Sequence, residues 1–138
     1  MAMTNGRNKG ASWERTVASM IKENLGATVK RDLEQYRSGD RGDLIGLDGF
    51  VIECKRYKMA NGGHHHQDWW HQVVNAASAV SLQTEPVLIY KYDRAEPKVV
   101  VRLSFLNDEY QGKPDIVTVS FDTWCMLVRE YWASHVQA

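Results

Sequence analysis

The sequence lacks the cysteines and the long apolar segments that would mark a disulfide-rich or membrane-spanning protein. It has two cysteines among 138 residues, and Cys54 and Cys125 lie far apart with no CxxC spacing. This spacing speaks against a disulfide framework or a cysteine-based zinc site, and it suits a reducing cytosol. No apolar run could span a membrane, and the first ten residues lack the apolar core of a signal peptide. We therefore expect a cytoplasmic protein with no membrane partner.

The chain also lacks net charge and internal repeats. Seventeen basic residues offset seventeen acidic ones, so the overall charge does not point to a polyanionic partner. The distribution is uneven, however, because residues 1–60 carry eleven basic and eight acidic residues and the remainder carries six and nine. A basic first half is compatible with contact to nucleic acid, although a solvated surface gives the same pattern.

The length of the chain and its composition, with 43% hydrophobic and 25% charged residues, predict one globular domain spanning residues 1–138. Helical periodicity predicts helices over residues 11–25 and 67–82 and a last helix capped by Ser120. The expected strands cover residues 27–35, 43–47, 50–56, 86–92, 98–105 and 115–120. We expect residues 1–10 to be flexible and residues 59–66 to form a mobile loop. This order of elements predicts an α/β fold, with helices flanking a sheet.

Two acidic residues occupy positions where the pattern favours apolar side chains. Glu14 lies within the apolar arc of the first helix, beside Trp13 and Val17. Glu53 lies on an otherwise apolar strand, and it shares one face with Lys55 because successive strand side chains alternate. A buried carboxylate needs a partner, and an ordinary buried salt bridge is the simplest one.

A third acid, Asp43, begins the strand that precedes the Glu53 strand. The turn between the two strands contains Asp48-Gly49, which favours a two-residue hairpin loop. That loop would place Leu44 opposite Glu53, so that Asp43 and Glu53 would lie on different faces of the sheet. A bulge or a three-residue loop would bring the two acids together. We predict this departure from the simplest hairpin.

These residues suggest a specific chemistry. Two carboxylates a few ångströms apart repel each other unless a proton or a cation lies between them, and hard oxygen ligands suit Mg²⁺. A lysine beside them can act on a water molecule or stabilise charge that develops on a phosphate. Glu14, Asp43, Glu53 and Lys55 therefore indicate metal-assisted hydrolysis of a phosphodiester.

The order of Glu14, Asp43 and the Glu53-Cys54-Lys55 segment resembles the PD-(D/E)xK nuclease superfamily. In that superfamily a helix glutamate, a strand aspartate and an E-x-K strand form one active site. Gly42 stands here in place of the proline of the motif. The segments "NKGASWER", "RSGDRGDLIG" and "VIECKRYK" are similar to Holliday junction resolvases of archaeal and bacteriophage type. The resemblance covers residues 9–92.

The resemblance implies a restriction-endonuclease-like core with a mixed central sheet. It also implies a homodimer in a bacterial cytoplasm that makes two symmetric cuts across a four-way DNA junction. Asp43, Glu53 and the main-chain carbonyl of Cys54 would bind Mg²⁺, for which Mn²⁺ would substitute. Lys55 would act on the attacking water, and Glu14 would complete the metal shell or orient a metal-bound water. Ser38 matches a serine that resolvases place near the scissile phosphate.

Basic residues surround these motifs in sequence, as recognition of phosphates requires. The candidates for contacts to the DNA backbone are Arg7, Lys9, Arg37, Arg41, Arg56 and Lys58. No base-reading motif is visible, so we expect recognition of DNA shape. For the histidines at positions 64–66, we favour a solvated loop beside the DNA over a zinc site.

Two other functions are compatible with the same residues. A related nuclease of this fold could cut linear or foreign DNA, and a non-catalytic module could keep the fold and only bind DNA. The joint presence of Glu14, Asp43, Glu53 and Lys55 favours an enzyme, because a decayed site usually loses at least one such residue.

Overall fold

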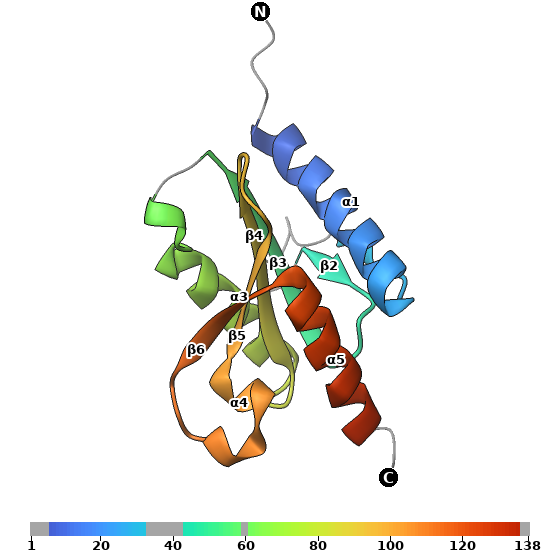
Figure 1. Ribbon diagram of the computed structural model, residues 1–138, viewed down its shortest axis with the longest axis vertical. Helices are drawn as coiled ribbons and strands as arrows, with labels where there is room; N and C mark the ends of the chain where they lie inside the picture. Colours follow the sequence, from blue (N-terminus) through green and yellow to red (C-terminus); the bar gives the residue numbers. More distant parts are fainter. Residues whose placement is uncertain (1–5, 33–42, 59–60, 136–138) are drawn as a thin grey trace, which may run out of the picture.

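The computed structural model describes residues 6–32, 43–58 and 61–135 (Figure 1). The helical elements are α1 (Gly6–Leu25), η1 (Asn61–Gly63), α3 (Gln67–Val80), α4 (Leu103–Leu106), η2 (Asp108–Tyr110) and α5 (Phe121–His135), of which η1 and η2 are short 3-10 turns. The strands are β1 (Lys30–Arg31), β2 (Leu44–Ile45), β3 (Phe50–Tyr57), β4 (Glu85–Tyr92), β5 (Lys98–Arg102) and β6 (Ile116–Ser120).

These strands form one sheet in sequence order, from β1 to β6. β3 and β4 run parallel, whereas the other neighbouring strands are antiparallel. α1 and α5 lie on one side of the sheet and α3 lies on the other (Figure 1). The predicted α/β architecture with a mixed sheet flanked by helices is therefore confirmed. Among the helices that the structure describes, none is both long and apolar enough to cross a membrane.

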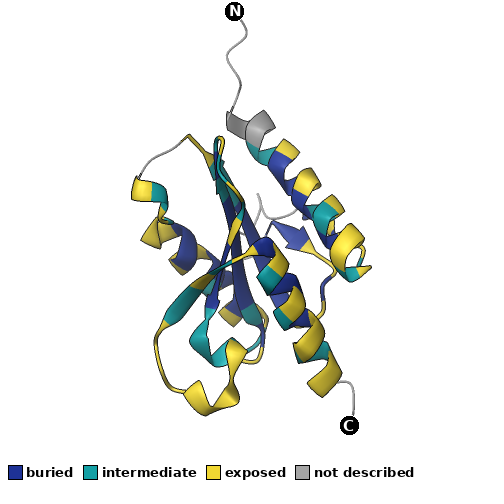
Figure 2. Ribbon diagram, viewed as in Figure 1, coloured by how far each residue is buried: buried dark blue, intermediate teal, exposed yellow. Residues whose placement is uncertain are grey.

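The sheet separates two hydrophobic cores, and the central strands are buried from both sides (Figure 2). On one side, Trp13 and Val17 of α1 pack in the same cluster as Ile52 of β3. On the other side, Val73 of α3 packs in a cluster with Leu88 of β4. Because β3 and β4 are covered on both faces, apolar residues occupy successive positions in each strand, at residues 50–52 of β3 and 86–90 of β4. A charged residue in β3 is therefore withdrawn from water.

The first helix is longer than its apolar pattern predicts. α1 begins at Gly6, whereas periodicity places its start at residue 11, so residues 6–10 are helical where the sequence predicts a flexible segment. Trp13 is the first buried residue among the described side chains of α1. The apolar pattern misses the first turns because the sequence of residues 6–10 contains no large hydrophobic residue.

Residues 103–106 form α4, and this corrects the predicted strand over residues 98–105. The pairing of β5 with β6 ends at Arg102, which lies opposite Ile116, the first residue of β6. The chain then turns into a helix that brings the Phe105 ring to 5.6 Å from the ring of Phe50. The sequence of residues 98–105 alone does not show where the pairing with β6 ends, so it predicts a strand that continues through residue 105.

Two strands near the N-terminal half are shorter than predicted. β1 covers Lys30–Arg31 of the strand expected over residues 27–35, of which residues 33–35 lie outside the described residues. β2 covers Leu44–Ile45 of the strand expected over residues 43–47. Their short pairing leaves the chain around Asp43 close to the end of both strands.

The segment predicted as a mobile loop, residues 59–66, is anchored where the structure describes it. The Tyr90 hydroxyl donates a hydrogen bond to the Gly63 carbonyl at 3.2 Å, and the Tyr92 hydroxyl donates one to the His64 carbonyl. The His66 ring lies edge-on to Trp69 at 4.5 Å. The main chain at Gly63 and His64 and the His66 ring are thus tied to β4 and α3, while the side chains of His64 and His66 are exposed. The mobility of this segment stays a prediction, and residues 59–60 lie outside the described residues.

The hairpin between β2 and β3 departs from the simplest register, as predicted. The Phe50 amide donates to the Leu47 carbonyl at 3.1 Å across the Asp48-Gly49 turn, but Leu44 lies opposite Ile52 rather than opposite Glu53. Two residues on the β2 arm, Ile45 and Gly46, therefore oppose one residue on the β3 arm, which is the definition of a bulge. The shift places Asp43 level with Glu53.

Gly46 makes this bulge possible. Its φ angle is +115°, a conformation that side chains with a Cβ atom rarely adopt. A Cβ atom at this position would lie 2.8 Å from the Thr28 carbonyl oxygen and 3.3 Å from the Val29 Cα atom. The backbone of the hairpin thus packs against the segment before β1 only because residue 46 is glycine.

We expect Gly46→Ala to lower the free energy of unfolding by about 1–3 kcal/mol, because the new Cβ meets backbone atoms and the φ angle is strained. Gly10→Ala is the matched control, since a Cβ there would have no neighbour within 4 Å. In the helix interior the control should stabilise the protein by about 0.5–1 kcal/mol. Urea denaturation measures both changes, and equal stabilities for the two variants would contradict the role assigned to Gly46.

Candidate active site

Three elements bring three acidic side chains into the interior of the protein. Glu14 comes from α1, Asp43 directly precedes β2, and Glu53 lies in the middle of β3. Their exposed fractions are 6%, 8% and 0%, respectively. Acidic residues are rarely buried to this degree without a partner. The structure therefore brings together the three carboxylates that the sequence predicts as one site.

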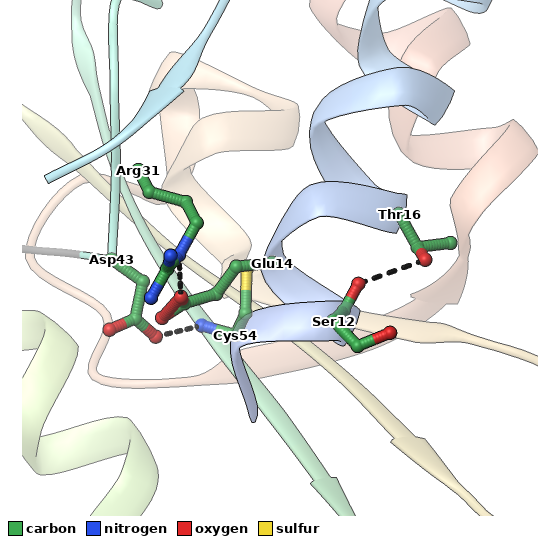
Figure 3. Close-up of polar contacts among 6 residues, drawn as sticks. All are labelled: Ser12, Glu14, Thr16, Arg31, Asp43 and Cys54. Carbon is green, nitrogen blue, oxygen red and sulfur yellow. Dashed lines mark hydrogen bonds and ion pairs between the residues drawn. The ribbon is translucent and has the colours of Figure 1, made fainter. Parts of the chain in front are cut away.

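Glu14 has an arginine partner. Arg31 of β1 donates a hydrogen bond from Nε to Glu14 Oε2 at 2.7 Å, and Figure 3 shows the guanidinium between the side chains of Glu14 and Asp43. Burial raises the pKa of Glu14, the hydrogen bond from Arg31 opposes that rise, and the nearby charge of Asp43 adds to it. Glu14 thus forms the buried salt bridge that is the simplest arrangement for a buried carboxylate, and it does so beside the other two acids.

Asp43 is fixed by the main chain on both sides. Its Oδ2 atom accepts a hydrogen bond from the Cys54 amide at 2.7 Å (Figure 3). Its own amide donates to the Ile52 carbonyl at 2.8 Å, and its carbonyl accepts from the Asp32 amide at 2.9 Å. These bonds orient the Asp43 carboxylate toward β3 before any ligand binds.

Glu53 is the carboxylate without a hydrogen-bond partner. Both of its oxygens are buried, and neither has a partner in the part of the chain that the structure describes. Burial, together with the charge and close approach of Asp43, raises its pKa to about 9, and the charge of Lys55 opposes this rise. Without a cation, Glu53 is therefore protonated at neutral pH. A divalent ion would replace that proton and satisfy both oxygens.

The residues present fit a magnesium ion by the kind of donor they offer. Mg²⁺ commonly binds one or two protein carboxylates and keeps several waters, so Asp43 and Glu53 with one main-chain carbonyl are a sufficient set. Over residues 6–32, 43–58 and 61–135, no three His, Cys, Asp or Glu side chains gather as a ligand set. Glu14 would therefore act on a metal-bound water rather than bind the ion directly as a third carboxylate ligand. Burial also raises the pKa of the Cys54 thiol, so its sulfur stays protonated and only its carbonyl is a suitable ligand.

Three further predicted residues, all basic, follow Glu53 in and just after β3. Lys55 is half-buried, and its ammonium lies close enough to oppose the rise in the pKa of Glu53. Arg56 pairs with Asp93, with 3.4 Å between Nε and Oδ1. Lys58 is exposed just after the strand. Lys55 is therefore the cation of this group that acts on Glu53, and Arg56 and Lys58 lie further along the chain.

The other predicted DNA contacts and the predicted serine are not placed by the structure. Arg7 and Lys9 belong to the first turns of α1, where the side chains are not described. Arg37, Ser38 and Arg41 lie within residues 33–42, outside the described residues. Their roles stay predictions.

Sequence reasoning missed Arg31 and Asp32. Arg31 occupies an ordinary strand position in the sequence, and its role appears only when β1 is paired with β2, which sets Arg31 opposite Leu44 and next to Asp43. Asp32 is 2% exposed, and its amide holds the Asp43 carbonyl. The available signal was indirect: a buried Glu14 requires a cation, and the neighbouring strand supplies one.

The pKa of Glu53 predicts a pH dependence of stability in metal-free buffer. Its folded value of about 9 lies above the model value of 4.5, so the unfolded chain binds fewer protons than the folded protein between these values. The free energy of unfolding should therefore be highest at low pH and fall as pH rises through that window. In Glu53→Gln, which mimics the protonated side chain, the fall should be smaller.

Urea denaturation at about pH 5 and about pH 8.5, with a chelator present, measures this effect. We expect wild type and Glu53→Gln to be similar at the lower pH and the variant to be more stable at the higher pH. Asp48→Asn is the control, since Asp48 is an exposed acid in the same hairpin. Parallel curves for wild type and Glu53→Gln would show that Glu53 is ionised without a metal.

The fold has a counterpart among solved structures. It is similar to Hjc, a Holliday junction resolvase from the archaeal hyperthermophile Archaeoglobus fulgidus, with a TM-score of 0.55 and 15% sequence identity. The match covers 87% of this chain and 98% of that chain. At this identity the likeness shows the fold, and it confirms the predicted restriction-endonuclease-like core. No curated protein matches the chain.

Family membership rests on the sequence itself. Residues 5–129 match the family described as "Phage putative PDDEXK endonuclease". Nucleases of this type generally use a divalent metal ion, which agrees with the donor set of Asp43 and Glu53. Because the match includes Glu14, Asp43, Glu53 and Lys55 and spans most of the sequence, the chain belongs to this family of phage PD-(D/E)xK endonucleases.

Proposed function

We propose that this endonuclease is a Mg²⁺-dependent enzyme that resolves four-way Holliday junctions by phosphodiester hydrolysis, with Mn²⁺ as an effective substitute. One observation carries the catalytic part of the proposal: Glu53 holds two buried oxygens that have no partner among the described residues, beside a fixed Asp43. A protein retains such an arrangement at a cost in stability, and a bound cation offsets that cost. The likeness of the fold to a resolvase supports the choice of substrate.

Each residue has a role that follows from its position. Asp43, Glu53 and the Cys54 carbonyl would hold the ion, which supplies Lewis-acid stabilisation of the phosphate and lowers the pKa of bound water. Lys55 lies near Glu53 on the same face of β3, and it would orient or deprotonate the attacking water. Glu14, held by Arg31 at 2.7 Å, would orient a water at the edge of the site.

The substrate is a polyanion, and the cations at the end of β3 support its binding. Arg56 and Lys58 follow Lys55 directly, so phosphates bound by them would lie along the strand that carries Glu53. In this proposal Arg7, Lys9, Arg37 and Arg41 add contacts to the DNA backbone, and Ser38 lies near the scissile phosphate. Two symmetric cuts require two sites, so the active form is a homodimer.

The test uses a four-way junction, a Y-fork and a linear duplex of matched sequence, each with Mg²⁺ or with a chelator. We expect paired, symmetric nicks in the junction with Mg²⁺ only. Asp43→Asn should slow cutting by at least about a hundredfold because it removes a metal ligand. Asp48→Asn, an exposed acid of the same hairpin, should cut like wild type.

Two other results would indicate a different function. Equal cutting of linear duplex would indicate a related nuclease for linear or foreign DNA, and binding without cutting would indicate a non-catalytic module. Mixing wild type with Asp43→Asn tests the dimer. A homodimer should yield junctions nicked on one strand, whereas an active monomer would still cut both strands.

A further inference from the structure

Tyr57, the last residue of β3, has an exposed ring backed by buried aromatic side chains. Its ring stacks on Trp69 with 5.1 Å between centroids and 20° between planes. Tyr57 is 51% exposed, whereas Trp69 is 8% exposed. Behind Trp69 lie Tyr90 and Tyr92, each with its centroid 6.1 Å from the Trp69 ring. We call these four residues the aromatic cluster, of which Tyr57 is the outer member.

The aromatic cluster is held rigidly. Tyr90 and Tyr92 are each 2% exposed, and their hydroxyls donate to the carbonyls of Gly63 and His64. The main chain at Tyr57 is also fixed, because its carbonyl accepts a hydrogen bond from the Asp93 amide at 3.0 Å. A ring supported in this way loses little conformational freedom when a flat ligand binds to its exposed side.

The aromatic cluster lies beside the candidate active site. Alternation along β3 puts Tyr57 on the same face as Glu53 and Lys55. A rise of about 3.3 Å per residue places Tyr57 about 13 Å from Glu53, which corresponds to roughly four base steps of about 3.4 Å. Lys55 shares this face with Tyr57, whereas alternation turns Arg56 and Lys58 to the other face, so a nucleic acid strand bound by Lys55 along this face would pass over the Tyr57 ring.

We infer that Tyr57 stacks on a nucleobase whose face is open at the branch point of the DNA, and so contributes to selection of branched substrates. The inference rests on the proposed function for the presence of DNA at this site. Within a continuous duplex both faces of each base are covered by neighbouring bases, so the Tyr57 ring finds no open face. At a branch point the stack is interrupted. Stacking on an aromatic ring tolerates any base, which agrees with the absence of a base-reading motif.

The test measures binding in metal-free buffer, so that it does not depend on cutting. Junctions with 5-iodouracil at the branch point are irradiated with wild-type protein, and the crosslinked residue is identified by mass spectrometry. Affinities for the junction and for matched linear duplex are measured by fluorescence anisotropy. Tyr57→Phe keeps the ring, and Tyr57→Leu keeps only apolar bulk. Tyr110→Ala is the control. Tyr110 is also exposed, at 40%, but it lies in η2, which follows the far end of β5 from Tyr57.

We expect the crosslink to form at Tyr57 with the junction and not with linear duplex. Tyr57→Leu should weaken junction binding by about tenfold or more while leaving duplex binding unchanged, and Tyr57→Phe should bind like wild type. A crosslink elsewhere, or an equal loss for junction and duplex, would overturn the inference. A change in the oligomeric state of Tyr57→Leu would overturn it too, since the ring would then contact a second copy of the chain. If the protein bound junctions in this way but never cut them, the inference would stand and the proposed enzyme would fail.

Discussion

Burial of three carboxyl groups at one place is the constraint on which the site depends. Glu14, Asp43 and Glu53 come from separate elements; the charge of Asp43 raises the pKa of both Glu14 and Glu53, and Glu14 adds to the rise at Glu53. Arg31 partly neutralises Glu14 and the Cys54 amide holds Asp43, but nothing in the described structure satisfies Glu53. The arrangement is unfavourable in isolation and would become favourable if a cation entered it, as we propose. Stability and activity are therefore linked through the same few atoms.

The rest of the fold keeps this arrangement in place. Two cores cover β3 on both faces, so Glu53 cannot turn toward solvent. The bulge at Ile45 and Gly46 brings Asp43 level with Glu53, and a glycine is required there because the chain passes close to Thr28. The same strand then runs out to Tyr57, whose ring is backed by the aromatic cluster. Strand β3 thus connects the buried acids to the exposed ring that we propose contacts DNA.

The sequence predicted the inward placement of the three acids where chemistry and periodicity agree. The three acids stood out because they interrupt apolar patterns, and the hairpin bulge followed from the need for Asp43 and Glu53 to meet. The sequence did not predict the role of Arg31, because that role depends on the pairing of β1 with β2, and two-residue strands show no clear alternation of apolar and polar residues. The sequence predicted a strand where α4 lies, because β5 ends only where its pairing partner β6 begins, at Ile116, and the β5 sequence does not show this point. The aromatic cluster joins residues from β3, α3 and β4, and only the packed structure shows that they meet.

The most direct test of the central claim is the number of protons released when Mn²⁺ binds. Near pH 7.5 the metal-free protein should carry a proton on Glu53, whose pKa is raised to about 9, and the ion must displace it. Calorimetric titration in two buffers of different ionisation enthalpy should therefore show release of about one proton in wild type and none in Glu53→Gln. Absence of binding, or binding with no proton released, would contradict the account of Asp43 and Glu53 as a shared metal site.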